Sequence, residues 1–350
     1  QSAAEQVAEH LRREVAAGVW QEEMPGIGPL KRQLGVNHKT VDAALALLER
    51  QGVLESQGQR KPRRIREAGT VAGTAALRIG FLLREKTDRS LDFIVEARHR
   101  LIERGHQPFF ARKCLLELGQ DQDKVAALVG RTEADAWVVQ AAPRPVIEWF
   151  AARNQPCFAL FGFFRRVDIA AAGPDKSPAY MAVAEELVRL GHRRIALLAR
   201  PQRRVPLPGH PERHFLQTLT EAGIEITNWH FPIWKETRED FHRCIEDLFR
   251  NFAPTALLVD EAPFFAAVQQ ILAARRLRVP QDVSLVCTDP DPTFRWQIPS
   301  VAHISWEPEP WVNRLMRWTE NTASGRRDRR QVLTKAKFVP GGTIGPVNGG

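Results

Sequence analysis

The first residues with functional chemistry lie at the start of a predicted helix, where Asn37 is followed by His38, Lys39 and Thr40. Asn37 has the residue type and position of a helix N-cap. Four apolar residues after it are spaced as i, i+3, i+4 and i+7, which predicts one buried face: Val41, Ala44, Leu45 and Leu48. The same spacing directs His38, Lys39 and Asp42 outward. Cationic and polar side chains at an exposed helix start suit contacts with phosphates and base edges.

The elements that must position these side chains lie in residues 1–66. Ile27 to Leu34 predicts a short helix, and the tight Gly35-Val36 turn joins it to the helix at His38, which is a helix-turn-helix arrangement. An amphipathic helix over Ala3 to Ala17 precedes both, since apolar side chains recur there at every fourth position. Helices followed by a hairpin predict a winged-helix domain, and the small, aperiodic residues 67–76 predict a linker.

The hairpin, or wing, is the second basic feature. Val53 to Ser56 and Arg63 to Ile65 predict two short strands, and the stretch from Gln57 to Arg66 holds five basic residues and no acidic one. Cations beside a helix-turn-helix favour contact with DNA phosphates or the minor groove. The candidate DNA-binding residues are Lys31, Asn37, His38, Lys39, Thr40, Asp42, Gln59, Arg60, Lys61 and Arg63. The purely structural alternative is a capped surface helix beside a solvated hairpin tip.

From Leu77 onward the chain alternates apolar strand segments with helical segments, which predicts an α/β fold with parallel strands covered on both faces. The predicted strands are residues 78–83, 107–111, 136–140, 157–161, 195–199, 256–259, 283–287 and 301–305. The predicted helices are residues 89–104, 121–130, 145–154, 177–190, 212–222, 237–251, 263–276 and 308–323.

One barrel could hold these elements, but two doubly wound sheets fit better. Glycines and prolines interrupt the pattern between Gly162 and Pro178, and further extended pieces are expected at residues 224–234 and 337–339. We therefore expect a two-lobed domain over residues 77–345, with residues 77–172 and 288–312 in one lobe and residues 173–287 and 313–345 in the other. A ligand would bind between the lobes, at the carboxyl ends of the strands.

Polar residues directly after predicted strands are candidates for this cleft. Arg84 follows the first strand as a possible donor, and Asp175 is a similar candidate. Asp289 could accept bonds from two ligand hydroxyls, or could merely cap the chain after its strand. Asp260 and Glu261 could bind ligand or cap the helix that follows them. Trp306 follows the last crossover strand, and its ring suits the C–H face of a sugar, although a large indole also suits a core.

Composition narrows the class of protein. A formal net charge of +9 with an isoelectric point near 9.8 favours an anionic partner. The four cysteines are far apart, which predicts buried free thiols in a reducing cytoplasm. No apolar run of bilayer length and no signal-peptide pattern is present, so we expect no membrane association. The ten histidines form no ligand set, and no catalytic motif is recognisable, so we expect no metal, no cofactor and no enzymatic activity.

The two parts resemble known families. Met24 to Arg66 resembles the GntR-type winged helix of bacterial repressors, through Met-Pro, Leu-Gly-Val, Lys-Thr-Val and Ala-Ala-Leu followed by Leu-Leu-Glu-Arg-Gln-Gly. The body resembles the LacI/GalR effector-binding domain, which is related to periplasmic sugar-binding proteins. Its marks are the segments Leu190 to Ala196 and Arg278 to Val286, and the later Asp289.

The sequence departs from both family patterns. Arginines that the GntR family carries are replaced here by Gly28, His38 and Asp42. Because arginine is the commonest reader of guanine, the family's base preferences cannot be transferred. In the body, the family's ligand arginine corresponds to a position near Pro211, so the resemblance makes Arg213 a displaced substitute. It also makes Trp234 an aromatic contact for ligand, with a core or rim position as the alternative. The pair Asp260-Glu261 matches an acidic pair of the family within one residue of register.

Together the resemblances imply a homodimeric transcription regulator, which we expect to be a repressor. It would bind a double-stranded DNA operator and respond to a small-molecule effector, a sugar or sugar derivative. The alternative is a cytoplasmic solute-binding or sugar-processing protein whose head binds a protein partner. The effector, the operator sequence and the direction of the response cannot be read from the sequence.

Overall fold

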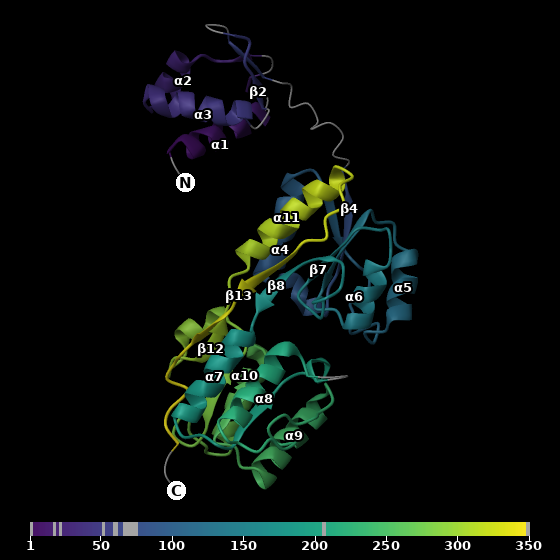
Figure 1. Cartoon of the computed structure of the whole chain (residues 1–350), viewed down its shortest axis with the longest axis vertical. Coiled ribbons are helices and arrows are strands. Elements are labelled where there is room, and N and C mark those ends of the chain that lie inside the picture. The colour runs from purple at the N-terminus through teal and green to yellow at the C-terminus, as the bar shows by residue number, and fades with distance from the viewer. Residues whose placement is uncertain are drawn as a thin grey trace. The chain divides into compact units, whose positions relative to one another are not determined.

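The computed structural model describes residues 3–16, 19–20, 23–50, 53–58, 62–65, 76–204 and 208–347. The chain divides into two compact units, residues 1–75 and residues 76–350 (Figure 1). Each unit has its own hydrophobic core. The expected α/β class with an N-terminal helix-turn-helix domain is confirmed.

The first unit packs three helices against a small sheet. Its helices are α1 (Ala3–Ala16), α2 (Ile27–Leu34) and α3 (His38–Arg50), and its strands are β1 (Glu23–Met24), β2 (Leu54–Glu55) and β3 (Arg63–Ile65). The strand β3 lies between the other two and pairs antiparallel with both. The predicted stripe on α3 is fully buried, and it packs with residues of α1 and α2: Leu11, Leu30, Val41, Ala44, Leu45 and Leu48.

The turn between α2 and α3 depends on a glycine. Gly35 has a φ of 65°, in the left-handed region that glycine adopts most readily, and its N–H donates to the Lys31 carbonyl oxygen at 3.1 Å. This cap ends α2 and sets the direction in which α3 begins.

The second unit contains two lobes, and the first lobe has a six-stranded sheet. The strand order is β13-β8-β7-β6-β4-β5, and all of its pairs are parallel. The strands are β4 (Arg78–Leu82), β5 (Gln107–Phe110), β6 (Ala136–Gln140), β7 (Cys157–Leu160), β8 (Ala170–Asp175) and β13 (Gln331–Lys335).

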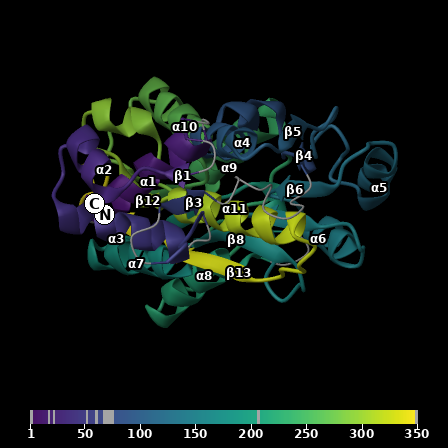
Figure 2. The ribbon, with the colours of Figure 1, turned by 90° about the horizontal axis from the view of Figure 1, so that it is seen from above.

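Helices cover both faces of this sheet. The helices α4 (Asp92–Glu103) and α11 (Glu309–Ala323) lie side by side on one face, and a 3-10 turn, η1 (Lys86–Ser90), precedes α4. The helices α5 (Gln122–Gly130) and α6 (Arg144–Ala151) lie together on the other face (Figures 1 and 2). The buried strands therefore have apolar side chains on both sides, as the sequence pattern predicts.

The second lobe has a five-stranded sheet in the order β14-β12-β11-β10-β9, in which only β14 runs antiparallel. Its strands are β9 (Ile195–Leu198), β10 (Ala256–Val259), β11 (Ser284–Cys287), β12 (Ala302–Ser305) and β14 (Lys337–Val339). The helices α7 (Ser177–Arg189) and α8 (His210–Glu221) cover one face, and α9 (Arg238–Asn251) and α10 (Ala262–Ala274) cover the other. Two short 3-10 helices complete this lobe: η2 (Pro201–Arg203) and η3 (Pro292–Trp296).

Within the described residues, the chain passes between the lobes after β8, after β12 and after β13. The expected division of segments between the lobes is therefore wrong: β12 belongs to the second sheet, and α11 packs on the first. Trp311 and Trp318 of α11 pack against Phe93 and Phe158 of the first lobe. Helical periodicity shows that α11 has a buried face, but it does not show which lobe covers that face.

Two other expectations are corrected. The run Ala170–Asp175, which resembled a break in the pattern, is the buried strand β8. Its small side chains fit between β7 and β13. The expected extended piece at residues 224–234 is not a strand. The four cysteines are free thiols: Cys114, Cys157, Cys244 and Cys287. Three of them are buried, and Cys244 is partly buried.

The tight packing of β4 generates a stability prediction. A Cβ atom on Gly80 would lie 2.6 Å from the fully buried ring of Trp137. Gly80→Ala should therefore destabilise the second unit by about 1–3 kcal/mol, because the core must move to accept the methyl group. Chemical denaturation measures this. The control is Gly130→Ala in α5, where a Cβ meets nothing within 4 Å. Equal stability of the two variants would contradict the described packing.

Candidate functional site

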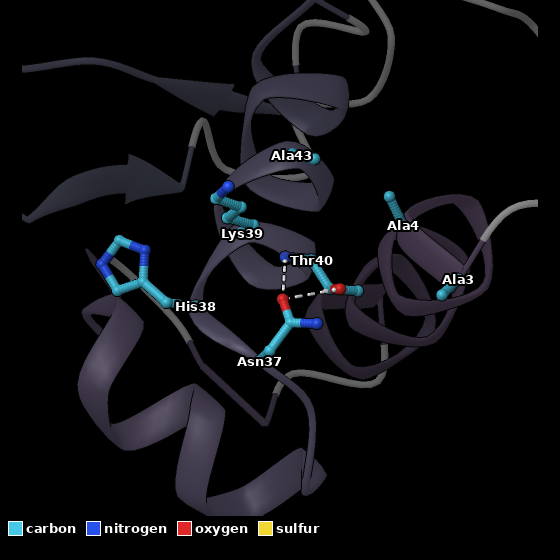
Figure 3. A pocket seen from close by; sticks show the side chains of 7 residues that line it. All are labelled: Ala3, Ala4, Asn37, His38, Lys39, Thr40 and Ala43. Atoms are coloured by element: carbon cyan, nitrogen blue, oxygen red, sulfur yellow. Dashed lines mark hydrogen bonds between the residues drawn. The ribbon is translucent and has the colours of Figure 1, made fainter.

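The start of α3 has the predicted cap. The Asn37 side-chain oxygen Oδ1 accepts from the Thr40 backbone N–H at 2.9 Å and from the Thr40 hydroxyl at 3.0 Å (Figure 3). These bonds occupy the Asn37 side-chain oxygen and the Thr40 hydroxyl hydrogen, whereas the Asn37 amide NH2 group is not part of the cap. His38 and Lys39 are exposed beside them. The side chains of His38 and Lys39 and the Asn37 NH2 group are therefore candidate donors at this helix start.

A shallow hollow lies beside this cap. It is lined by the first residues of α1 and α3: Ala3, Ala4, Asn37, His38, Lys39, Thr40 and Ala43 (Figure 3). A helix N-terminus presents unpaired backbone N–H groups that favour an anion. The sequence analysis did not select Ala3, Ala4 or Ala43, since alanine carries no recognisable chemistry.

The wing strand is tied to α3 by ion pairs. Arg63 of β3 lies 2.5 Å from the Glu49 carboxylate, measured from Nε to Oε1, and 3.6 Å from Asp42, measured from Nη2 to Oδ1. Two predicted DNA contacts, Asp42 and Arg63, thus pair with each other. Lys31 and Arg64 are exposed. The predicted contacts Gln59, Arg60 and Lys61 lie outside the described residues.

In the second unit, polar residues at the strand ends of the two lobes meet in one ion cluster. Arg84, which follows β4, donates from Nη2 to both Glu236 carboxylate oxygens at 2.9 and 3.1 Å. Its Nη1 donates to Glu261 Oε1 at 3.3 Å. Arg200, which follows β9, pairs with Glu236, Glu261 and Glu85. We call these five residues the inter-lobe cluster, because Arg84 and Glu85 belong to the first lobe and the others to the second.

The inter-lobe cluster has an excess of negative charge. Its two guanidinium groups are nearly buried, with side chains 10% and 8% exposed, and they face three carboxylates. Burial, together with the neighbouring Asp260 carboxylate, raises the pKa of Glu261 to about 7. Glu261 also has a φ of 58°, a strained conformation for a residue with a side chain. The arrangement holds Glu261 toward Arg84 and Arg200.

A second polar group surrounds Asp289, after β11. Lys176 Nζ lies 2.5 Å from Asp289 Oδ1, and the Trp306 indole N–H donates to the same oxygen at 3.1 Å. Thr288 Oγ1 lies 2.9 Å from Asp289 Oδ2 and 2.8 Å from Asp260 Oδ1, so its single proton serves one of the two carboxylates. Burial opposes ionisation of Asp289, but the Lys176 ammonium outweighs it and lowers the pKa of this carboxyl.

The structure thus brings together five of the predicted effector residues: Arg84, Asp260, Glu261, Asp289 and Trp306. Asp175 lies at the end of β8 and pairs with Arg165 at 2.6 Å. Trp234 is 4% exposed and packs in the second-lobe core, where its indole N–H donates to the Ala199 carbonyl oxygen at 2.9 Å.

Arg213 is exposed on α8. The side chain that points into the protein at this part of α8 is that of the neighbouring Glu212, which is fully buried. No hydrogen bond or ion pair among the described residues joins Arg213 or Trp234 to the five residues named above, so an effector contact for either one stays a prediction. One step along a helix turns the side chain by about 100°, so a register error of one residue exchanges a buried position for an exposed one.

Lys176, Arg200 and Glu236 belong to the site and were missed from the sequence. Arg200 directly follows a strand, as Arg84 does, so the same rule could have found it. Glu236 lies in a loop before α9 and Lys176 precedes α7. Neither has a local pattern that distinguishes it from other charged loop residues.

The raised pKa of Glu261 generates a pH prediction. The folded state holds the Glu261 proton up to about pH 7, whereas the unfolded chain loses it near its ordinary pKa of 4.5. Wild-type stability from this group therefore falls as the pH rises across that window. Glu261→Gln has no carboxyl group to titrate at this position. The melting temperature of the variant minus that of wild type should therefore be more positive at pH 7.5 than at pH 5. The exposed Glu185→Gln serves as control, and a difference that is independent of pH would contradict the assignment.

Comparison with known proteins follows the same division of the chain. Residues 3–61 match the family model of the bacterial regulatory proteins of the gntR family. Residues 184–344 match the periplasmic binding protein-like domain. Among curated proteins, none matches the chain in sequence.

Solved structures resemble the chain in fold. A sugar-binding transcriptional regulator of the LacI family from Escherichia coli, complexed with phosphate, has a TM-score of 0.60 at 16% identity and covers 77% of this chain and 98% of its own. The transcriptional regulator CelR in complex with cellobiose has a TM-score of 0.62 at 16% identity, covering 91% and 100%. A LacI family regulator from Enterococcus faecium with bound ribose has a TM-score of 0.60 at 13% identity, covering 77% and 100%.

The described residues contain no helix with the length and apolar character needed to cross a membrane. They also contain no group of three or more His, Cys, Asp or Glu side chains placed to hold a metal ion. The chain therefore joins a region that matches the gntR-family model to a region that matches the periplasmic binding protein-like domain, and the fold of the second unit resembles that of LacI-family regulators.

Proposed function

We propose that this protein is a homodimeric transcription repressor that binds a DNA operator and responds to a carbohydrate held between its lobes. One observation carries the proposal: a winged helix with exposed His38 and Lys39 is joined to a body in which polar strand ends of two lobes converge. The partners of such a protein are double-stranded DNA and a small molecule. Its place of action is the cytoplasm, where bacterial DNA lies. The protein needs no catalytic group.

The DNA contact follows from the geometry of α3. In a helix-turn-helix the second helix enters the major groove by its first residues, which here are His38 and Lys39. Related winged helices carry arginine at three positions. This chain has Gly28, His38 and Asp42 at these positions. Asp42 also pairs with Arg63. Contacts to phosphates therefore supply most of the affinity, through Lys39, the hollow beside Asn37 and exposed cations such as Arg32 and Arg64.

A second copy of the chain accounts for exposed apolar side chains on both lobes. On α4 and just before it, Leu91, Val95 and Ile102 form one stripe, with Val95 51% and Ile102 55% exposed. In the second lobe, Trp296 and Ile298 are 74% and 98% exposed. Contiguous exposed apolar side chains mark association surfaces. A dimeric Lac repressor, similar in fold at 18% identity and a TM-score of 0.60, supports the same arrangement.

Effector control follows from the crossings between the lobes. Regulation requires that the effector bind the DNA-competent and DNA-free conformations with different affinities. A ligand that enters between the lobes must compete with the pairs of Arg84 and Arg200. Carbohydrates offer many donors and acceptors for such an exchange, and the regulators of similar fold named above were solved with cellobiose and with ribose.

The DNA assignment predicts a salt-dependent defect in Lys39→Ala. Losing one phosphate or base-edge cation should weaken operator binding and reduce the slope of log affinity against log salt by about 1. Mobility-shift titrations at several salt concentrations measure both. Lys113→Ala, an exposed lysine of the body, is the matched control. If the two variants bind DNA with equal affinity, α3 is not the reading helix.

The dimer assignment predicts dissociation of Val95→Glu/Ile298→Glu, which places one carboxylate in each apolar surface. The dimer dissociation constant should rise by more than about 100-fold, because four buried apolar side chains are lost per dimer. Sedimentation velocity measures the change. Ile233→Glu, at another exposed isoleucine, is the control and should leave the dimer intact. A double variant that dimerises like wild type would place the interface elsewhere.

A further inference from the structure

The amino-terminal turns of α7 and α8 contain buried polar atoms without hydrogen-bond partners. Glu212 is fully buried, and neither of its carboxylate oxygens has a hydrogen-bond partner among the described residues. The hydroxyl groups of Tyr180 and Ser177 are also unpartnered there, with the side chains 0% and 6% exposed. Buried polar groups are normally bonded, and leaving one unpaired costs about 1–3 kcal/mol. We call these three residues the α7-α8 subsite.

The three residues belong to two helices that pack against each other, α7 and α8. Tyr180 packs edge-on against Phe215, one turn after Glu212, with ring centroids 6.3 Å apart. Burial raises the pKa of the Tyr180 hydroxyl well above its usual range, and the Glu212 charge adds to the rise. Ser177 lies one turn before Tyr180 on α7. Glu212 folds back over Gly209, where any Cβ would lie 2.2 Å from its Oε2. The absence of a side chain at residue 209 therefore permits this orientation.

This location adjoins the proposed effector cleft. Arg203 connects the two, since its Nη1 lies 3.7 Å from Glu212 Oε1 and its Nε lies 4.0 Å from Asp260 Oδ2. Asp260 in turn shares Thr288 with Asp289. At 3.7 Å, the Arg203 contact is an ion pair without a hydrogen bond. Both Glu212 carboxylate oxygens, which lack a hydrogen-bond partner among the described residues, can therefore accept from a donor.

The charges around the cleft favour a cation. Three carboxyl groups, Glu212, Asp260 and Asp289, face two cations, Arg203 and Lys176. Burial raises the pKa of the Glu212 carboxyl, and a cation beside it would favour its charged form. The inter-lobe cluster likewise has three carboxyl groups for two guanidinium groups, although the pKa of Glu261 is about 7, so the negative excess there grows as the pH rises above 7. Anionic groups such as phosphate or carboxylate would add to an existing negative excess. An ammonium group would neutralise part of it and donate to acceptors that have no partner.

We propose that Glu212, with Tyr180 and Ser177, binds an amino group of the effector, so that the effector is an amine-bearing carbohydrate. This inference rests on the proposed function, since it assumes that the cleft takes a carbohydrate. Glu212 accepts from the ammonium group, and the hydroxyls of Tyr180 and Ser177 complete the polar shell. Asp289 and the inter-lobe cluster bind the remaining hydroxyls. Glu212 is a specificity-determining residue in this arrangement.

The test compares sugars that differ in one group. Thermal shift and calorimetric titration at pH 7 use three pairs, glucosamine with glucose, galactosamine with galactose and mannosamine with mannose, together with glucose 6-phosphate. At least one amine should bind wild type more than 10-fold tighter than its neutral partner, and glucose 6-phosphate should not bind. Glu212→Gln should weaken that amine by about 10- to 100-fold, the range of a charge-assisted hydrogen bond, and leave the neutral sugar unchanged.

Two further variants keep the test decisive. Tyr180→Phe removes only the hydroxyl and should weaken the same amine by a smaller factor, even if Glu212→Gln melts early without ligand. Glu221→Gln, an exposed carboxylate on the same helix, is the matched control. Tighter binding of a neutral or phosphorylated sugar, or equal affinity of Glu212→Gln and wild type for the amine, would overturn the inference alone. If no sugar binds wild type, the carbohydrate assignment of the proposed function fails as well.

Discussion

The buried carboxylate of Asp289 is the interaction on which the two-lobed body depends. It binds Lys176, at the crossing after β8, and the Trp306 indole, at the crossing after β12. Trp306 also packs against Phe93 and Phe161 of the first lobe and Trp311 of α11. One carboxylate therefore holds two of the connections that must bend when the lobes move. Under the proposed function, a ligand hydroxyl or amine that changes the bonding of Asp289 would act on both connections.

Under the proposed function, the inter-lobe cluster favours a polar ligand. Arg84 and Arg200 are nearly buried, and a buried charge that loses its partner costs about 3–5 kcal/mol. Arg84 pairs with Glu236 and Glu261 of the other lobe, and Arg200 pairs with Glu85 of the other lobe, so opening the lobes would break these pairs. A ligand between the lobes would have to replace them. A ligand rich in hydroxyl groups can do so from either lobe. Whether the two lobes stay together thus depends on which groups bind the hydrogen-bond donors and acceptors at the strand ends.

Much of this architecture could be predicted from the sequence, because buried periodicity is a local property. The stripe from Val41 to Leu48, the cap at Asn37 and nearly all helices of the body follow from it. The strand β8 was missed because alanine and glycine give little apolar signal, although Ala170 to Ala172 are buried between neighbouring strands. The structure places β12 in the second lobe and α11 on the first lobe, the reverse of the expectation. Which sheet each element joins depends on long-range pairing, and a local sequence pattern contains no information on that.

The site was predicted only in part, because its residues are brought together by long-range contacts. Residues that follow strands, such as Arg84, Glu261 and Asp289, could be found because strand ends converge. Arg213 was preferred over Glu212 on charge and register, whereas the orientation of α8 buries the glutamate. Glu236 and Lys176 contribute from loops, where only the folded chain shows which charges meet.

The central claim is that filling the cleft changes DNA binding through Asp289. The most direct measurement is the anisotropy of an operator duplex selected from a random pool, titrated with protein with and without a saturating sugar that binds wild type. Wild-type affinity should change at least about 5-fold, the low end of known allosteric coupling, whereas Asp289→Asn should bind the operator normally without responding to the sugar. An operator affinity that the sugar leaves unchanged in wild type, or a full response in Asp289→Asn, would contradict the account.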